Sequence, residues 1–131
     1  MTIRELGKKY KLDGAVDVWK CHNNWILTHD AITKIALIDN IKLSRLEPIY
    51  QSETSCRFLV TMVKEDKDGN VIDSVTSVGE ADNRNSKNNY YGSMAEKRGI
   101  DRCVLKLINA YQYGIYSEVE ADDFKKENKW K

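Results

Sequence analysis

GEADNRNSKNNYYGSMAEKRGIDRCVLKL, residues 79–107, joins the end of a predicted strand to a predicted long helix. Residues 80–91 have no apolar period, so they predict a polar, Asn-rich loop that is long for a compact domain. Ser93 and Glu96 form a Ser-x-x-Glu capping box, which predicts that a helix begins there and runs to about Tyr111. Gly114 ends this helix or lies just beyond it.

Strands are predicted upstream of this stretch. Residues 41–50 predict a strand that has Pro48 near an edge or an end. Residues 56–64 predict a strand because they are rich in Phe, Leu, Val, Thr and Met. Residues 71–78 predict a second strand that returns after Asp68-Gly69, which is a strong hairpin signal. Both sides of 71–78 are mixed in polarity, which is typical of an antiparallel sheet with one covered face.

The two ends of the chain are more polar. Residues 1–14 predict a loosely held arm that can include a short helical turn, and residues 125–131 predict a frayed tail. Thr28 or Asp30 can cap a helix that runs to about Asn40. Ser117 and Glu120 form a second capping box, which predicts a short C-terminal helix.

The order of these elements predicts an α+β fold in one domain over residues 15–124. Its centre is a three-stranded antiparallel sheet, flanked by an N-terminal helix and a long C-terminal helix, with the short terminal helix added. Trp19 and Trp25 flank a polar stretch, and such large side chains close the edge of a core more often than they stack on a base.

Composition limits the classes of function. The 131 residues are 41% hydrophobic and 31% charged, which is typical of a soluble globular protein. No apolar run approaches the roughly 20 residues that span a bilayer, and the N-terminus lacks the apolar core of a signal peptide, so we expect a cytoplasmic protein with no membrane partner. The net charge of +1 means that any nucleic-acid binding must come from local charge asymmetry.

Nothing in the chain predicts catalysis, and we expect neither a metal nor a cofactor. Cys21, Cys56 and Cys103 are too few and too widely spaced for a disulfide framework or a zinc site, so they predict reduced thiols. His22 and His29 have no nucleophile pattern nearby. The protein is therefore expected not to be an enzyme.

The predicted long helix carries a basic face. Arg98, Arg102 and Lys106 recur at four-residue spacing, so they lie on one side, opposite an apolar stripe. A row of cations about 6 Å apart approaches the spacing of backbone phosphates. The alternative is an ordinary solvated face, in which Asp101 pairs with Lys97. Gly99 lies within this helix, where it either permits close approach of another backbone or is a local weakness.

The predicted loop adds positive charge and aromatic rings beside the helix start. Tyr90 and Tyr91 predict stacking on unpaired bases or, equally, packing of the helix start onto the sheet. Because bases are free to stack only in an unpaired strand, single-stranded nucleic acid is the expected ligand. The expected binding residues are Arg84, Lys87, Tyr90, Tyr91, Lys97, Arg98, Arg102 and Lys106.

At these residues the chain resembles the phage single-strand annealing proteins, the Erf/Sak-like recombinases, which share a sheet-and-helix core with eukaryotic annealing mediators. The resemblance rests on Val78–Ala81 at the end of a hairpin, on Tyr90-Tyr91 and on Met94–Leu107. The ending Tyr116–Phe124 is also similar to the tails of phage proteins of this kind. The resemblance covers residues 26–124, and its second half is the distinctive part.

The resemblance implies ATP-independent binding and annealing of single-stranded DNA on a ring or filament of identical subunits. It implies that Arg98, Arg102 and Lys106 hold phosphates. The expected function is therefore that of a single-stranded DNA-binding, strand-annealing phage recombination protein in a bacterial host cell, with a homo-oligomer as the assembly it allows. The alternative is a protein-interaction module with a host protein as its partner, such as a phage inhibitor of a host defence nuclease.

Overall fold

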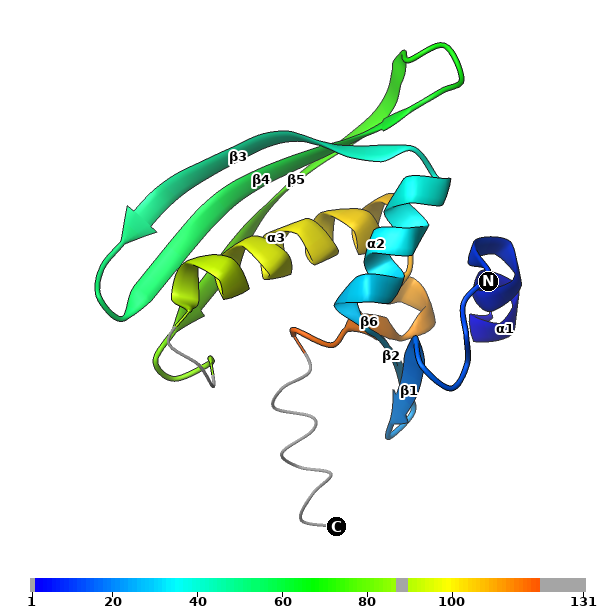
Figure 1. The fold of residues 1–131 in the computed structure, drawn as a ribbon, viewed down its shortest axis with the longest axis horizontal. Coiled ribbons are helices and arrows are strands. Elements are labelled where there is room, and N and C mark those ends of the chain that lie inside the picture. The colour runs from blue at the N-terminus through cyan, green and yellow to red at the C-terminus, as the bar shows by residue number, and fades with distance from the viewer. Residues whose placement is uncertain (1, 87–89, 121–131) are drawn as a thin grey trace.

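A computed structural model of the chain describes residues 2–86 and 90–120, and it shows an α+β architecture with two three-stranded sheets (Figure 1). The predicted α+β class is therefore confirmed, whereas the single sheet that was predicted is only one of the two. The helices and strands are α1 (Ile3–Tyr10), β1 (Val18–Cys21), β2 (Asn24–Leu27), α2 (His29–Ile38), β3 (Ile41–Gln51), β4 (Ser55–Glu65), β5 (Val71–Asp82), α3 (Tyr91–Leu107), the 3-10 helix η1 (Tyr111–Tyr113) and β6 (Ile115–Ser117).

The larger sheet contains the three predicted strands in the antiparallel order β3-β4-β5. Gly69 in the turn between β4 and β5 has φ of 84°, a left-handed conformation that glycine adopts without strain. Strand β5 continues past its predicted end at Val78, because its last residue, Asp82, still pairs with Ser55 at the start of β4. The predicted long loop is correspondingly shorter.

Helix α3 lies across one face of the larger sheet (Figure 1). A Cβ on Gly79 of β5 would lie 1.9 Å from the Ala95 carbonyl oxygen, and a Cβ on Gly99 would lie 2.6 Å from Val60 Cγ2. The two glycines therefore allow the backbones of α3 and β5 to touch, which confirms close approach as the role of Gly99. The predicted capping box is wrong, because α3 begins at Tyr91 and Ser93 already lies inside it.

Helix α2 begins after Thr28, whose hydroxyl accepts a hydrogen bond from the Ala31 N–H at 3.1 Å. Of the two candidate caps, Thr28 is therefore the one that the structure uses. The expected loose arm is wrong for most of residues 1–14, because they contain α1. Leu6 and Tyr10 are spaced one helical turn apart on the inner side of α1, and both are fully buried.

The smaller sheet was not predicted. Strands β1 and β2 form a hairpin whose turn places His22 at φ of 56°, and β6 pairs in parallel with β2. Ser117, the expected cap of a C-terminal helix, lies instead in β6, and residues 118–120 form a turn. The remainder of that predicted helix and the predicted tail 125–131 lie outside the described residues.

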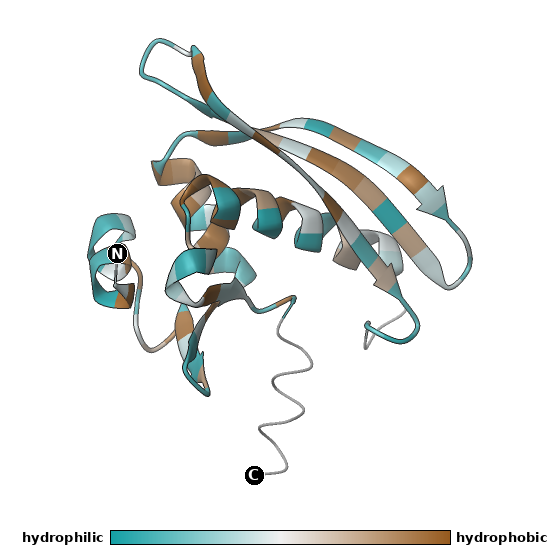
Figure 2. Cartoon of the chain, turned by 180° about the vertical axis from the view of Figure 1, so that it is seen from behind, coloured by the Kyte–Doolittle hydropathy of each residue, from teal (hydrophilic) through white to brown (hydrophobic). Residues whose placement is uncertain are grey.

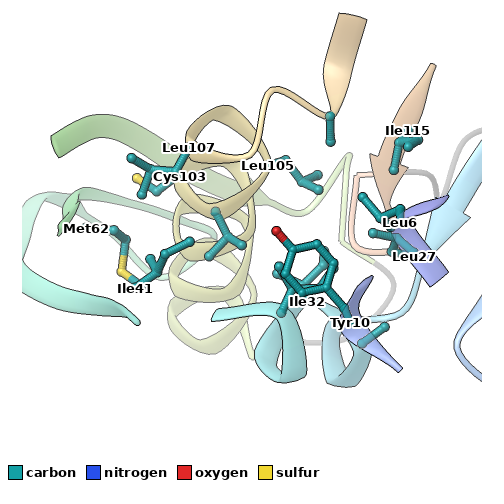
Figure 3. Packing of buried hydrophobic residues seen from close by; sticks show 14 of the residues in the cluster. Leu6, Tyr10, Leu27, Ile32, Ile41, Met62, Cys103, Leu105, Leu107 and Ile115 are labelled. Carbon is teal, nitrogen blue, oxygen red and sulfur yellow. The ribbon is translucent and has the colours of Figure 1, made fainter. Parts of the chain in front are cut away.

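One hydrophobic cluster connects both sheets and all three α-helices. Figure 3 shows Leu6 of α1 near Leu27 of β2 and Ile115 of β6, with Tyr10 and Ile32 beside them. At the other end, Met62 and Cys103 join the larger sheet to α3. All three cysteines are buried free thiols, as the sequence predicts. The opposite face of the larger sheet is not covered by α3, and Figure 2 shows hydrophilic and hydrophobic residues alternating along its strands.

Candidate nucleic-acid interface

Arg98 does not form part of an open cationic row. Its side chain is buried, with 4% of the residue exposed, and its Nε donates to the Val119 carbonyl at 2.9 Å. Its Nη1 donates to the Glu80 carbonyl at 2.9 Å and to Asn85 Oδ1 at 2.8 Å, and its Nη2 donates to the Asn85 carbonyl at 2.6 Å. The guanidinium therefore fastens three segments of the chain to one another and does not face solvent.

Arg102 is held between two carboxylates. Its two terminal nitrogens donate to Glu80 at 2.9 Å each, its Nε donates to Glu120, and Nη1 also reaches the Val78 carbonyl. The hydrogen bond from Arg102 holds the pKa of Glu80 below its usual range, so this carboxylate stays charged. Glu80 and Glu120 together neutralise Arg102 in place of a phosphate.

Lys106 is exposed, although its Nζ donates to Ser77 Oγ at 3.0 Å. The three cations do share one side of α3, as their spacing predicts, but this side faces β5 and the residues after β6. The expected phosphate-binding row of Arg98, Arg102 and Lys106 is therefore corrected: only Lys106 offers its charge to solvent.

The remaining expected binding residues differ in their exposure to solvent. Lys97 is exposed, and Tyr90 is 75% exposed at the start of α3. Tyr91 instead packs against the buried cluster of Cys56, Ala81 and Ala95, which is the packing alternative for this ring. Arg84 is exposed after β5, and Lys87 lies outside the described residues.

A groove of about 530 Å³ lies beside the contact between α3 and β5. The residues that line it are Ser77, Val78, Arg102, Lys106, Tyr111, Tyr116 and Glu120. The rings of Tyr111 and Tyr116 lie 5.6 Å apart at 56°, and the Tyr111 hydroxyl donates to Glu120 at 3.2 Å. Because the carboxylates balance Arg102, this groove has little excess positive charge to attract a phosphate.

A second hollow, of about 300 Å³, lies where β3 and β5 end and β4 begins. We call it the strand-end cleft, and it is lined by Tyr50, Thr54, Ser55, Arg57, Asp82, Asn83 and Arg84. Tyr50 and Arg57 face each other across β3 and β4, with the Arg57 guanidinium carbon 5.9 Å from the centre of the tyrosine ring. Tyr50 is 53% exposed. Two exposed arginines and one exposed aromatic ring therefore meet in one hollow.

The turn that carries Arg84 is held by Asp82. The Asp82 carboxylate accepts backbone N–H bonds from Arg84 at 2.8 Å and Asn85 at 3.0 Å, and these bonds lower the pKa of Asp82. Because Asp82 Oδ1 accepts both of these bonds, Asp82 fixes the turn beside the cleft. Among the expected site residues that the structure describes, Arg84 is the one that lines this cleft.

The sequence reasoning missed Tyr50 and Arg57. They lie on either side of the turn between two predicted strands, and a correct antiparallel register would have placed them opposite each other. That register includes an irregularity between Pro48 and Tyr50, which shifts the pairing by one residue. Strand prediction without register therefore could not bring the two side chains together.

A cluster of polar side chains joins α3 to α2 and β6. The fully buried Asp101 accepts a hydrogen bond from Ser117 Oγ at 2.7 Å, and its other oxygen lies 2.7 Å from His29 Nδ1. The pairing of Asp101 with Lys97, which belonged to the alternative of a solvated face, does not form, because Asp101 bonds to His29 and Ser117 inside the protein. The serine hydroxyl bonds to the carboxylate and not to the imidazole, so these residues do not have the geometry of a nucleophilic triad.

No family model, curated protein or solved structure matches this chain. Among residues 2–86 and 90–120, no three His, Cys, Asp or Glu side chains converge as a metal site would require. In the same part of the chain, no helix has the length and apolar character needed to span a bilayer.

Proposed function

We propose that the protein binds single-stranded DNA and that the strand-end cleft is the centre of its binding surface. The observation that carries the proposal is the convergence of exposed Arg57 and Arg84 with the half-exposed ring of Tyr50. This is the combination of positive charge and aromatic surface that the sequence predicted. It lies at the end of the larger sheet instead of along α3.

The binding mechanism is charge neutralisation with stacking, and no bond is made or broken. Arg57 and Arg84 hold backbone phosphates, because a guanidinium offers a planar fork of donors to phosphate oxygens. Tyr50 stacks on a base, and Tyr90, which is exposed at the start of α3, offers a second ring. Duplex DNA binds less tightly because its bases are already stacked on one another.

Strand annealing and assembly of identical subunits complete the proposed role in phage recombination. Both steps come from the sequence resemblance to the Erf/Sak-like recombinases. They are tested by the rate at which complementary labelled strands pair with and without the protein, and by light scattering in the presence of a single strand.

The binding proposal is tested by fluorescence anisotropy with labelled single- and double-stranded oligonucleotides at two salt concentrations. The double variant Arg57→Gln/Arg84→Gln is expected to lose about tenfold in affinity for the single strand. Its salt dependence is expected to flatten by about 1.4 in the log–log slope, because two phosphate contacts are lost.

The matched control is Lys9→Gln/Lys67→Gln, which removes the same charge at two exposed positions away from the cleft. This control should leave both affinity and slope close to those of the unaltered protein. Unchanged values for the Arg57/Arg84 variant, or equal losses in both variants, would contradict the proposal.

A protein-interaction module, such as a phage inhibitor of a host defence nuclease, is the second candidate. The net charge of +1 and the neutralisation of Arg102 by two carboxylates favour it, because strong attraction of a polyanion needs excess positive charge. Recovery of one stoichiometric protein partner, together with no retention on single-stranded DNA, would decide for this candidate.

A further inference from the structure

A groove of about 650 Å³ lies beside α1. Figure 1 shows α1 at the opposite end of the molecule from the turn between β3 and β4, whose residues line the strand-end cleft. The floor of the groove beside α1 is apolar and includes Leu12, Val18 of β1 and Trp25 of β2. All three side chains are partly buried and pack against the main hydrophobic cluster. The floor is therefore part of the packed core. The groove as a whole has the size of known ligand pockets, which hold about 300–1,000 Å³.

The rim of this groove is positively charged. Arg4, Lys8 and Lys11 recur along α1 and its C-terminal end at spacings of four and three residues, so they follow one side of the helix. All three are exposed, and none pairs with a carboxylate in the part of the chain that the structure describes. These cations, unlike Arg98 and Arg102, are available to a ligand.

Gly7 lies between the rim residues and also lines the groove. A Cβ on Gly7 would meet nothing within 4 Å, and its φ is not in the left-handed region, so neither packing nor backbone conformation requires glycine there. Glycine inside a helix nevertheless costs about 1 kcal/mol relative to alanine. Its effect is to leave the helix backbone open to the groove, where an occupant can approach closely.

We propose that this groove binds an acidic segment of a partner protein, with an aliphatic or aromatic side chain on the floor and carboxylates at Arg4, Lys8 and Lys11. Charge complementarity selects the acidic flanks, and the apolar floor selects the central side chain. A nucleic-acid base fits less well, because its polar edges would lose water against an aliphatic floor that returns few hydrogen bonds. This inference does not depend on DNA binding at the strand-end cleft.

The probe is a phage-displayed library of random short peptides, selected on the immobilised full-length chain. The expected outcome is enrichment of peptides in which Asp or Glu flank Leu, Phe or Trp. An enriched peptide is then synthesised with a fluorescent label, and its affinity is measured by anisotropy. Failure to enrich peptides of this composition overturns the proposal.

The decisive variant is Gly7→Leu, which places a branched apolar side chain in the groove. It is expected to weaken peptide binding about tenfold or more, because the leucine takes the space that the central apolar side chain of the peptide would occupy. The melting temperature should stay the same or rise, because leucine is a better helix former than glycine. Retained affinity in a folded Gly7→Leu variant would overturn the proposal.

The rim is tested by Arg4→Gln/Lys8→Gln, which should weaken binding about fivefold at low salt and less at high salt. Lys9→Gln is the matched control, because Lys9 lies over the Tyr10 ring and does not line the groove. Two other outcomes of Gly7→Leu would show that the proposal is wrong. Loss of binding to a single-stranded oligonucleotide would mean that the groove holds nucleic acid, and loss of self-association in light scattering would mean that it holds a second copy of the chain.

Discussion

The guanidinium of Arg98 joins β5, the turn after it and the segment after β6 through its bonds to Glu80, Asn85 and Val119. We expect Arg98→Met to lower the free energy of unfolding by about 3 kcal/mol or more, because it leaves one buried and three partly buried hydrogen bonds unmade. Urea denaturation measures this loss. Lys97→Met, at the exposed neighbouring position, should change stability by about 0.5 kcal/mol or less. Equal effects of the two changes would contradict the structural role of Arg98.

The hydrogen bond between His29 and Asp101 makes stability depend on pH. This bond raises the pKa of His29 against the opposing effect of its partial burial, and burial raises the pKa of Asp101. Lys97 and Asp30 also act on His29, in opposite directions. The folded protein therefore holds protons more tightly than the unfolded chain. The stabilisation is fully present below about pH 6.5 and is lost as the pH rises through the higher pKa of folded His29.

We therefore expect the free energy of unfolding to fall as the pH rises above about 6.5. Urea midpoints measured at a series of pH values above this point follow the fall. It should be absent from His29→Asn and retained in His22→Asn, because His22 is exposed in the turn between β1 and β2. Persistence of the full decrease in His29→Asn would show that another group is responsible.

At the scale of elements, α3 and β5 are in contact through glycine. We expect Gly79→Ala to cost about 3 kcal/mol or more, because the new Cβ would overlap the α3 backbone, which cannot move locally. Gly99→Ala meets the Val60 side chain and should cost about 1–3 kcal/mol. Gly92→Ala, near the start of the same helix, has nothing within 4 Å and should not destabilise.

A double-mutant cycle distinguishes the two glycines. Val60→Ala removes the atom nearest to a Cβ at position 99, so it should relieve part of the cost of Gly99→Ala. It should relieve none of the cost of Gly79→Ala. Urea denaturation of the single and double variants measures both couplings, and equal couplings would mean that α3 moves away from the sheet as a whole.

Helix α3 also shows what could be predicted from the sequence. The four-residue spacing placed Arg98, Arg102 and Lys106 on one side correctly, and the inference about Gly99 is confirmed. Periodicity could not predict whether that side faces solvent, because the spacing of an amphipathic helix indicates only one buried face and one solvent face. Helix α3 lies between the larger sheet and the elements α2 and β6, so its buried residues, Asp101 among them, surround its axis.

The long strands and α2 were predictable because each carries its signal locally. Asp68-Gly69 marks the turn between β4 and β5, and Thr28 caps α2. Strands β1, β2 and β6 have only three or four residues each, which is too few to show an alternating pattern. The strand-end cleft was missed for a related reason, since it depends on the register between β3 and β4.

At the scale of the whole molecule, α1 belongs to the packed core. We expect Leu6→Ala to lower the free energy of unfolding by about 2–5 kcal/mol, the usual effect of removing a buried leucine. Lys8→Ala on the exposed side of α1 should change it little. Thermal melts followed by circular dichroism measure both. A small effect of Leu6→Ala, comparable to that of Lys8→Ala, would show that α1 is held loosely and is not part of the core.

The parallel pairing of β2 with β6 bears on how the protein is made. Trp25 of β2 pairs with Ile115 of β6, and these residues are far apart in the sequence. Strand β2, the middle strand of the smaller sheet, can therefore complete its pairing only after the ribosome has synthesised β6. The β3–β4–β5 meander needs no such delay, because each strand follows its partner directly. During synthesis the meander can therefore form first, while the apolar side chains around β2 stay unprotected until Ser117 has emerged.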